Sequence, residues 1–137
     1  QILFIGDSSS SAGEVARYDV STGKLVMTAR SVGPMGVGFY YPTRAITCAS
    51  DGSFLFYGGY AVEGTGLTVT YAQPDPILSL TPDGRLAISA TTVYRASDGM
   101  VLGSLPATAS VQAVSPDGQK LYAISGGALQ TVDLTTY

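Results

Sequence analysis

A short turn motif in which aspartate precedes glycine recurs along this 137-residue chain and restricts its fold more than any other feature. The three copies read Ser50-Asp51-Gly52, Thr81-Pro82-Asp83-Gly84 and Ser115-Pro116-Asp117-Gly118. Each copy lies between two apolar runs, and this pattern predicts a β-hairpin with a tight turn. The glycines are 32 and 34 residues apart. A period of roughly 20 to 50 residues is typical of stacked structural repeats.

A second turn motif alternates with the first. The segment Tyr18–Val26 aligns with Tyr94–Leu102, sharing tyrosine, serine and glycine, and Val132–Thr136 begins like a third copy. Gly23 and Gly99 are 76 residues apart, or two units of 38. Strands of about five residues with short loops take roughly ten residues each, so two turn motifs per unit imply about four strands per unit.

The chain is predicted to be all-β. No segment has a helical apolar period longer than two turns, and glycine or proline interrupts almost every candidate window. The expected strands are Ile2–Ile5, Val15–Val20, Lys24–Ala29, Ala45–Ala49, Ser53–Tyr57, Leu67–Tyr71, Ile77–Leu80, Arg85–Ser89, Thr92–Ala96, Met100–Leu105, Val111–Val114, Lys120–Ile124 and Leu129–Leu134.

These turn motifs and their flanking strands resemble the blades of YVTN-type and related WD40-like β-propellers. The resemblance covers essentially the whole chain; it is best over Ile77–Tyr137 and weakest at Gly33–Thr43 and Tyr60–Pro76. It implies four-stranded antiparallel blades. It indicates little about function, because propellers include lactonases, dehydrogenase subunits, surface-layer proteins and peptide binders.

The resemblance also implies a division into blades. In that family pattern the Asp-Gly turn joins the second and third strands of a blade, and the Ser-Thr-Gly turn leads into the next blade. We therefore expect a partial propeller over 1–137, with a half blade at 1–23, a blade at 24–72, a short blade at 73–99 and a blade at 100–137. This amounts to about three and a half blades, whereas closed propellers typically have about four to eight.

An incomplete ring has consequences for partners, because each repeat buries its apolar face only against its neighbours. We expect the remaining propeller blades to belong to a longer protein, or a second chain to complete the ring. A small open or atypical structure is the remaining alternative.

Composition excludes several kinds of chemistry. The chain has no histidine, which removes the commonest general base, the Ser/His and Cys/His pairs and most transition-metal sites. Its seven basic residues are scattered and its net charge is −3, so nucleic acid is not an expected partner. No apolar run reaches the ~18 residues that span a bilayer. We expect no catalytic residue, no metal-binding residue and no cofactor in this chain.

Two sets of residues are candidate sites. Asp51, Asp83 and Asp117 recur with the repeat, and an aspartate before glycine is typical of a turn; metal binding is the alternative. The densest aromatic region is predicted as a possible binding surface for sugars, peptides or proteins, with packing between blades as the alternative. Its residues are Phe39, Tyr40, Tyr41, Tyr57 and Tyr60. The single cysteine, Cys48, is expected to be an inert small hydrophobic residue in a crowded inner strand.

The function hypothesis that follows is a non-catalytic β-propeller scaffold or recognition segment that binds protein, peptide or glycan. Few charged residues and abundant serine, threonine and glycine favour an extracytoplasmic location, whether secreted, periplasmic or at the cell surface. The alternative is a segment of a lactonase-like or oxidoreductase propeller enzyme whose catalytic residues lie mainly outside this chain. A repetitive cell-surface protein is a third possibility.

Overall fold

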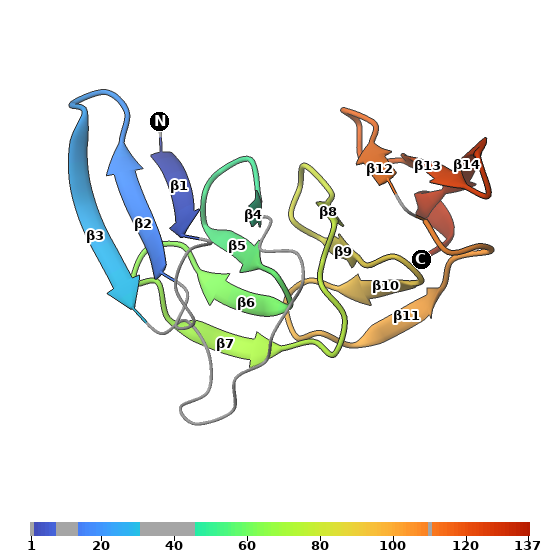
Figure 1. Cartoon of the computed structure of the whole chain (residues 1–137), viewed down its shortest axis with the longest axis horizontal. Helices are drawn as coiled ribbons and strands as arrows, with labels where there is room; N and C mark the ends of the chain where they lie inside the picture. Colours follow the sequence, from blue (N-terminus) through green and yellow to red (C-terminus); the bar gives the residue numbers. More distant parts are fainter. Residues whose placement is uncertain (1, 8–13, 31–45, 110) are drawn as a thin grey trace.

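The computed structural model describes residues 2–7, 14–30, 46–109 and 111–137. These residues form 14 strands, grouped in four antiparallel sheets that lie side by side along an open arc (Figure 1). One short 3-10 helix, η1 (Leu134–Thr136), follows the last strand. No helix among the described residues has the length and apolar character needed to cross a membrane.

Each sheet is a meander of consecutive strands. The first sheet contains β1 (Ile2–Asp7), β2 (Glu14–Asp19) and β3 (Lys24–Arg30). The second contains β4 (Ile46–Cys48), β5 (Phe54–Tyr57), β6 (Tyr60–Glu63) and β7 (Val69–Ala72). The third contains β8 (Ser79–Leu80), β9 (Leu86–Ile88), β10 (Thr92–Arg95) and β11 (Val101–Ser104). The fourth contains β12 (Val111–Val114), β13 (Lys120–Ser125) and β14 (Ala128–Asp133).

The strands keep a fixed order across the arc. Strands β4, β8 and β12 are the first strands of their sheets and lie along the concave side of the arc, whereas β3, β7 and β11 lie along the convex side (Figure 1). Neighbouring sheets touch through their inner strands, where β4 contacts both β1 and β8, and β8 contacts β12. The sheets are therefore arranged like segments around a common centre.

The Asp-Gly turns join the first and second strands of a sheet, linking β4 to β5, β8 to β9 and β12 to β13. The second turn motif joins β2 to β3 and β10 to β11 within one sheet. The blade division expected at 1–23, 24–72, 73–99 and 100–137 is therefore wrong, because β3 pairs with β2 and β11 pairs with β10. The sheets instead span 2–30, 46–72, 79–104 and 111–133.

One strand was not expected from the sequence. Strand β6 forms between Gly58-Gly59 and Gly64, and it pairs with both β5 and β7. Its four residues are too few to show an alternating pattern, and the flanking glycines favour an irregular loop. Burial on both sides stabilises it nevertheless, since Ala61 and Val62 are 0% exposed.

The core consists of layers of apolar side chains between adjacent sheets. Leu55 and Phe56 are neighbours on β5 that point to opposite faces, and both are 0% exposed. Leu55 packs with Phe4 of the first sheet, whereas Phe56 packs with Ala87 of the third. The second and third sheets are thus buried on both faces, and each such residue contributes roughly 1.5–3 kcal/mol by leaving water.

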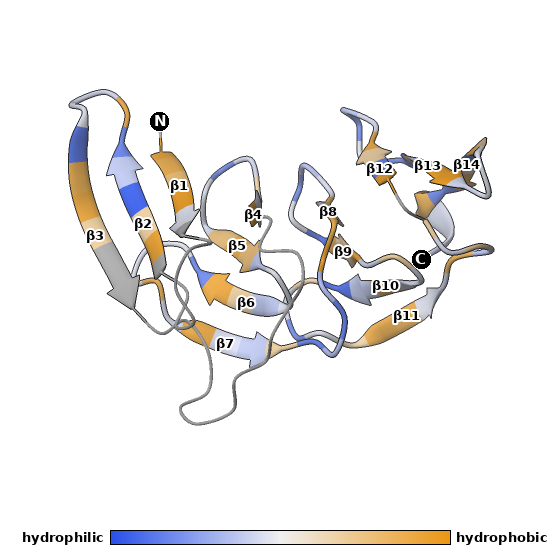
Figure 2. Ribbon diagram, viewed as in Figure 1, coloured by the Kyte–Doolittle hydropathy of each residue, from blue (hydrophilic) through white to orange (hydrophobic). Residues whose placement is uncertain are grey.

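The two end sheets are covered on one face only. On β1, Phe4 packs toward the second sheet, while Leu3 on the opposite face is 49% exposed. On β13, Leu121 packs toward the third sheet, while Tyr122 on the opposite face is 40% exposed. Figure 2 shows that β1 and β13 are nonetheless largely apolar.

Candidate functional site

Each recurring aspartate accepts hydrogen bonds within its own turn. Asp117 illustrates the arrangement: its Oδ1 accepts hydrogen bonds from the backbone amide of Gln119 at 3.0 Å and from the hydroxyl of Ser115 at 2.5 Å. Asp51 and Asp83 accept the amide two residues later in the same way, each at 3.0 Å. The glycines that follow have φ values of +70°, +70° and +72°, which L side chains rarely adopt. The turn interpretation is confirmed for all three.

These hydrogen bonds also set the charge of the carboxyl groups. The hydroxyl of Ser115 and the amide of Gln119 hold the pKa of Asp117 below its ordinary value, because both stabilise the charged form. The backbone amide and hydroxyl of Ser53 lower the pKa of Asp51 in the same way. Among the described residues, no group of three or more histidine, cysteine, aspartate or glutamate side chains is placed to hold a metal ion.

Two residues of the predicted aromatic surface, Tyr57 and Tyr60, lie in the described part of the chain. Phe39, Tyr40 and Tyr41 lie outside the described residues. Tyr57 and Tyr60 are 4% and 6% exposed and belong to the core between the first and second sheets, so the expectation that they form a binding surface is wrong. The alternative of packing between sheets holds for both, because a sheet with a neighbour on each side buries both alternating sets of side chains.

The environment of Cys48 also differs from expectation. The thiol belongs to β4, but the residue is exposed rather than enclosed. Strand β4 lies on the concave side of the arc (Figure 1).

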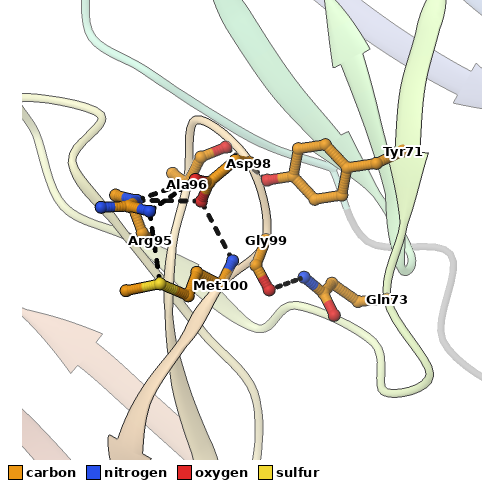
Figure 3. A network of polar contacts seen from close by, with 7 residues as sticks. All are labelled: Tyr71, Gln73, Arg95, Ala96, Asp98, Gly99 and Met100. Atoms are coloured by element: carbon orange, nitrogen blue, oxygen red, sulfur yellow. Dashed lines mark hydrogen bonds and ion pairs between the residues drawn. The ribbon is translucent and has the colours of Figure 1, made fainter.

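A network of polar contacts lies at the junction between the second and third sheets (Figure 3). The Tyr71 hydroxyl donates to the backbone carbonyl of Ala96, and the Gln73 side-chain amide donates to the carbonyl of Gly99 at 2.8 Å. Burial, with a smaller effect of the Asp98 carboxylate, raises the pKa of Tyr71 well above its usual range. The phenol therefore remains a hydrogen-bond donor at neutral pH.

The turn between β10 and β11, which accepts these two hydrogen bonds, is itself held by side-chain contacts. Arg95 forms an ion pair with Asp98, with Nη2 and Oδ2 2.6 Å apart, and Asp98 Oδ1 accepts the backbone amide of Met100 at 3.0 Å (Figure 3). Nearer the concave side, the hydroxyl of Ser50 donates to the carbonyl of Pro82 at 2.7 Å. The same two sheets are therefore fastened at two separate places.

An open groove of about 290 Å³ lies at this junction, where turns of both sheets meet. Its lining residues are Ala49, Ser53, Phe54, Glu63 and Thr70 from the second sheet and Asp83, Gly84, Ala96 and Ser97 from the third. Phe54 belongs to an aromatic cluster, since its ring centroid is 5.0 Å from that of Phe56 and 6.5 Å from that of Tyr71. The groove thus combines an aromatic ring, small residues and hydroxyl groups.

The two carboxylates of the groove are engaged in turns. Glu63 accepts the backbone amides of Thr65, at 2.6 Å, and Gly66. These amides, Gly66 first, lower the pKa of Glu63. Asp83 accepts the Arg85 amide, and its pKa is lowered chiefly by the Thr81 hydroxyl and then by that amide. Both groups are thus negatively charged structural acceptors at neutral pH.

Sequence reasoning did not find this groove. Its walls come from turns of two different sheets, and no linear motif links Phe54 with Ser97. The signal that could have marked it is the repeat register, which places the equivalent turns of adjacent sheets side by side at the same edge.

Antiparallel sheets of three and four strands, packed face to face around an open arc with the first strands innermost, define the chain as a run of β-propeller blades. A solved structure supports this class: hydrazine synthase from Kuenenia stuttgartiensis matches with a TM-score of 0.64 and 20% sequence identity. The match covers 90% of this chain and 40% of that chain. At this identity the likeness shows the fold alone. No protein-family model and no curated protein sequence matches the chain.

Proposed function

We propose that this chain is a non-catalytic β-propeller segment, a scaffold whose turn-bearing edge recognises a protein, peptide or glycan. The groove between the second and third sheets carries this proposal. It is open to solvent, and the hydrogen bonds from Tyr71 to Ala96 and from Ser50 to Pro82 hold its two walls. Preformed walls favour binding because less conformational entropy is lost when a ligand is ordered there.

The chemistry of the lining favours sugars or peptides. The ring of Phe54 offers an apolar face, and Ser97 provides a hydroxyl. The hydroxyls of Ser53 and Thr70 donate to Asp51 and to the Ala61 carbonyl, so their oxygens can accept hydrogen bonds from a ligand. The volume of about 290 Å³ is at the lower limit of about 300–1,000 Å³ for pockets that enclose drug-sized ligands. A single sugar ring or one side chain of an extended peptide suits this size better than a large cofactor.

The wider arrangement supports a scaffold. The outer faces of the end sheets carry exposed apolar residues such as Leu3 and Tyr122, which suits packing against further propeller blades. The composition, with 12% charged residues, favours an extracytoplasmic setting in this proposal.

Binding of the purified chain to glycan and peptide arrays tests the proposal. The Phe54→Ala variant should weaken binding of any ligand found by about tenfold or more, as expected for a central aromatic contact. Val101→Ala is the control, because it removes an exposed apolar side chain outside the groove and should leave binding unchanged. Equal loss in both variants, or none in either, would contradict a recognition role for the groove.

A second candidate function is a segment of a propeller enzyme, lactonase-like or part of an oxidoreductase, with catalytic residues mainly outside this chain. The observation in its favour is the structural likeness to a chain whose name is that of an enzyme, hydrazine synthase. Turnover of a lactone or redox substrate that depends on residues of this chain would support it over the recognition role.

A further inference from the structure

The position of a residue after the turn aspartate determines which neighbouring sheet its side chain faces. Counting from the turn aspartate, the fourth residue is Leu55, Ala87 or Leu121, and each is 0% exposed. Leu55 packs toward the first sheet, Ala87 toward the second and Leu121 toward the third. The fourth position therefore always faces the preceding sheet.

The fifth position faces the following sheet. Phe56 packs with Ala87, and Ile88 packs with Leu121; both Phe56 and Ile88 are 0% exposed. The equivalent residue of the fourth sheet is Tyr122, which is 40% exposed. The outer face of the fourth sheet thus presents the half of a junction that the other sheets bury.

That face is apolar across three strands. Tyr122 pairs with Ala113 on β12 and with Thr131 on β14. Two residues along from these partners, and so on the same face, lie Val111, 62% exposed, and Leu129, 72% exposed. The exposed apolar residues therefore form a continuous surface and are not isolated.

The first sheet offers the opposite half of a junction. Phe4 faces the second sheet and packs with Leu55, as the fifth-position residues do in the other sheets. Leu3 and Ile5 point the other way and are 49% and 48% exposed. This outer face is the side that would meet a preceding sheet, and the two outer faces lie at opposite ends of the arc (Figures 1 and 2).

We propose that a second copy of this chain packs head to tail on both outer faces, so that Tyr122 of each copy meets Leu3 of the other. The inference rests on the proposed function in treating the chain as an incomplete propeller. Its support is continuity: the contact repeats the fifth-to-fourth-position packing of Phe56 on Ala87 and Ile88 on Leu121. A ring of two open arcs would contain eight sheets, within the typical range of about four to eight blades. Contacts between unlike faces close into a ring when the rotation allows it.

Analytical ultracentrifugation of the purified chain tests this assembly. The wild-type chain should sediment as a dimer at protein concentrations on the order of 100 µM. The Leu3→Glu and Tyr122→Glu variants should each be monomers, because a dimer of either variant would bury a glutamate in both of its contacts. Val101→Glu is the control: this residue is 60% exposed on β11, away from both outer faces, and the variant should remain a dimer. Circular dichroism establishes that each variant keeps its β structure.

Mixing the two glutamate variants gives the decisive result. One mixed pair joins the unaltered Tyr122 of the Leu3→Glu chain to the unaltered Leu3 of the Tyr122→Glu chain, so the mixture should regain dimer mass with one contact per pair. A mixture that stays monomeric, a dimer insensitive to either variant, or a monomeric wild-type chain would overturn the second-copy proposal. Ligand binding at the groove by a monomeric chain would show that the proposed function survives this failure.

Discussion

The Tyr71 hydroxyl on β7 donates a hydrogen bond to the backbone carbonyl of Ala96, which lies in the next sheet and 25 residues further along the chain. The bond joins the outer edge of the second sheet to the turn between β10 and β11 (Figure 3). Together with the Gln73 side chain on Gly99, it fixes the outer side of the groove.

Removing that hydroxyl should destabilise the fold modestly. Tyr71→Phe keeps the ring but leaves the Ala96 carbonyl without this donor, and we expect a loss of about 1 kcal/mol in the free energy of unfolding. Urea denaturation followed by circular dichroism measures it. Val101→Thr is the control, since this side chain is 60% exposed on β11 and away from both outer faces, and it should change stability by much less. Equal effects would argue against the contact.

Gly99 and Gly23 occupy equivalent turns but differ in their surroundings. Both have positive φ, +75° and +65°, so alanine at either position costs about 1–2 kcal/mol of backbone strain. A Cβ at Gly99 would lie 2.2 Å from Nε2 of Gln73 and 2.8 Å from Cε2 of Tyr71, whereas at Gly23 no described atom lies within 4 Å. Gly99→Ala should therefore lower the melting temperature clearly more than Gly23→Ala; similar decreases would show that the junction can relax.

The junction core should be sensitive to truncation. Phe56 is 0% exposed between the second and third sheets, and Phe56→Ala should reduce the free energy of unfolding by about 3–5 kcal/mol through lost burial and a cavity. Phe54→Ala removes a ring of the same size at the partly exposed groove and should cost less. Equilibrium unfolding of both variants compares them, and a smaller loss for Phe56→Ala would contradict the packing.

Acid should weaken the turns. Hydrogen bonds lower the pKa of Asp117, Asp51 and Asp133 in the folded chain below the ordinary value of 3.8. Their stabilisation is therefore complete above that value and is lost as pH falls through the folded-state pKa. The melting temperature should decline below about pH 4. Asp117→Asn, which keeps an oxygen acceptor but cannot titrate, should show a shallower decline in a scan from about pH 6 to about pH 2; an unchanged slope would argue against a contribution from Asp117.

The hairpin turns could be predicted from the residues because their chemistry is local. Asp117 and Gly118 need only their immediate neighbours to form the turn, and the same applies to the strands on either side. The all-β fold follows from this local information, as does the number of strands in the described part of the chain, to within one.

The grouping of strands into sheets could not be predicted in the same way. The turns at Gly23 and Gly99 connect hydrogen-bonded strands just as the Asp-Gly turns do, so the residues alone do not show which turn lies inside a sheet. The division into blades depends on which long connection leaves the sheet, and this is decided by contacts between distant segments.

The exposure of individual side chains could not be predicted either, because it depends on the neighbouring sheets. The rings of Tyr57 and Tyr60 look suited to a surface, yet a sheet lies over each face of β5 and β6 and buries them. Cys48 shows the reverse error, because a strand on the concave side has less cover than its apolar neighbours suggest. The groove itself exists only where two sheets meet.

Several side chains in the described part of the chain cross from one sheet to the next and donate to main-chain carbonyl oxygens, among them Ser50 to Pro82, Tyr71 to Ala96, Gln112 to Ile88 and Tyr137 to Ser104. Every amino acid supplies such an oxygen, so the accepting repeat can change its side chains without losing the bond as long as its backbone keeps its path. Adjacent repeats can consequently drift far apart in composition while their docking persists. Evolution can thus erase recognisable sequence kinship from such an array long before it alters the shape.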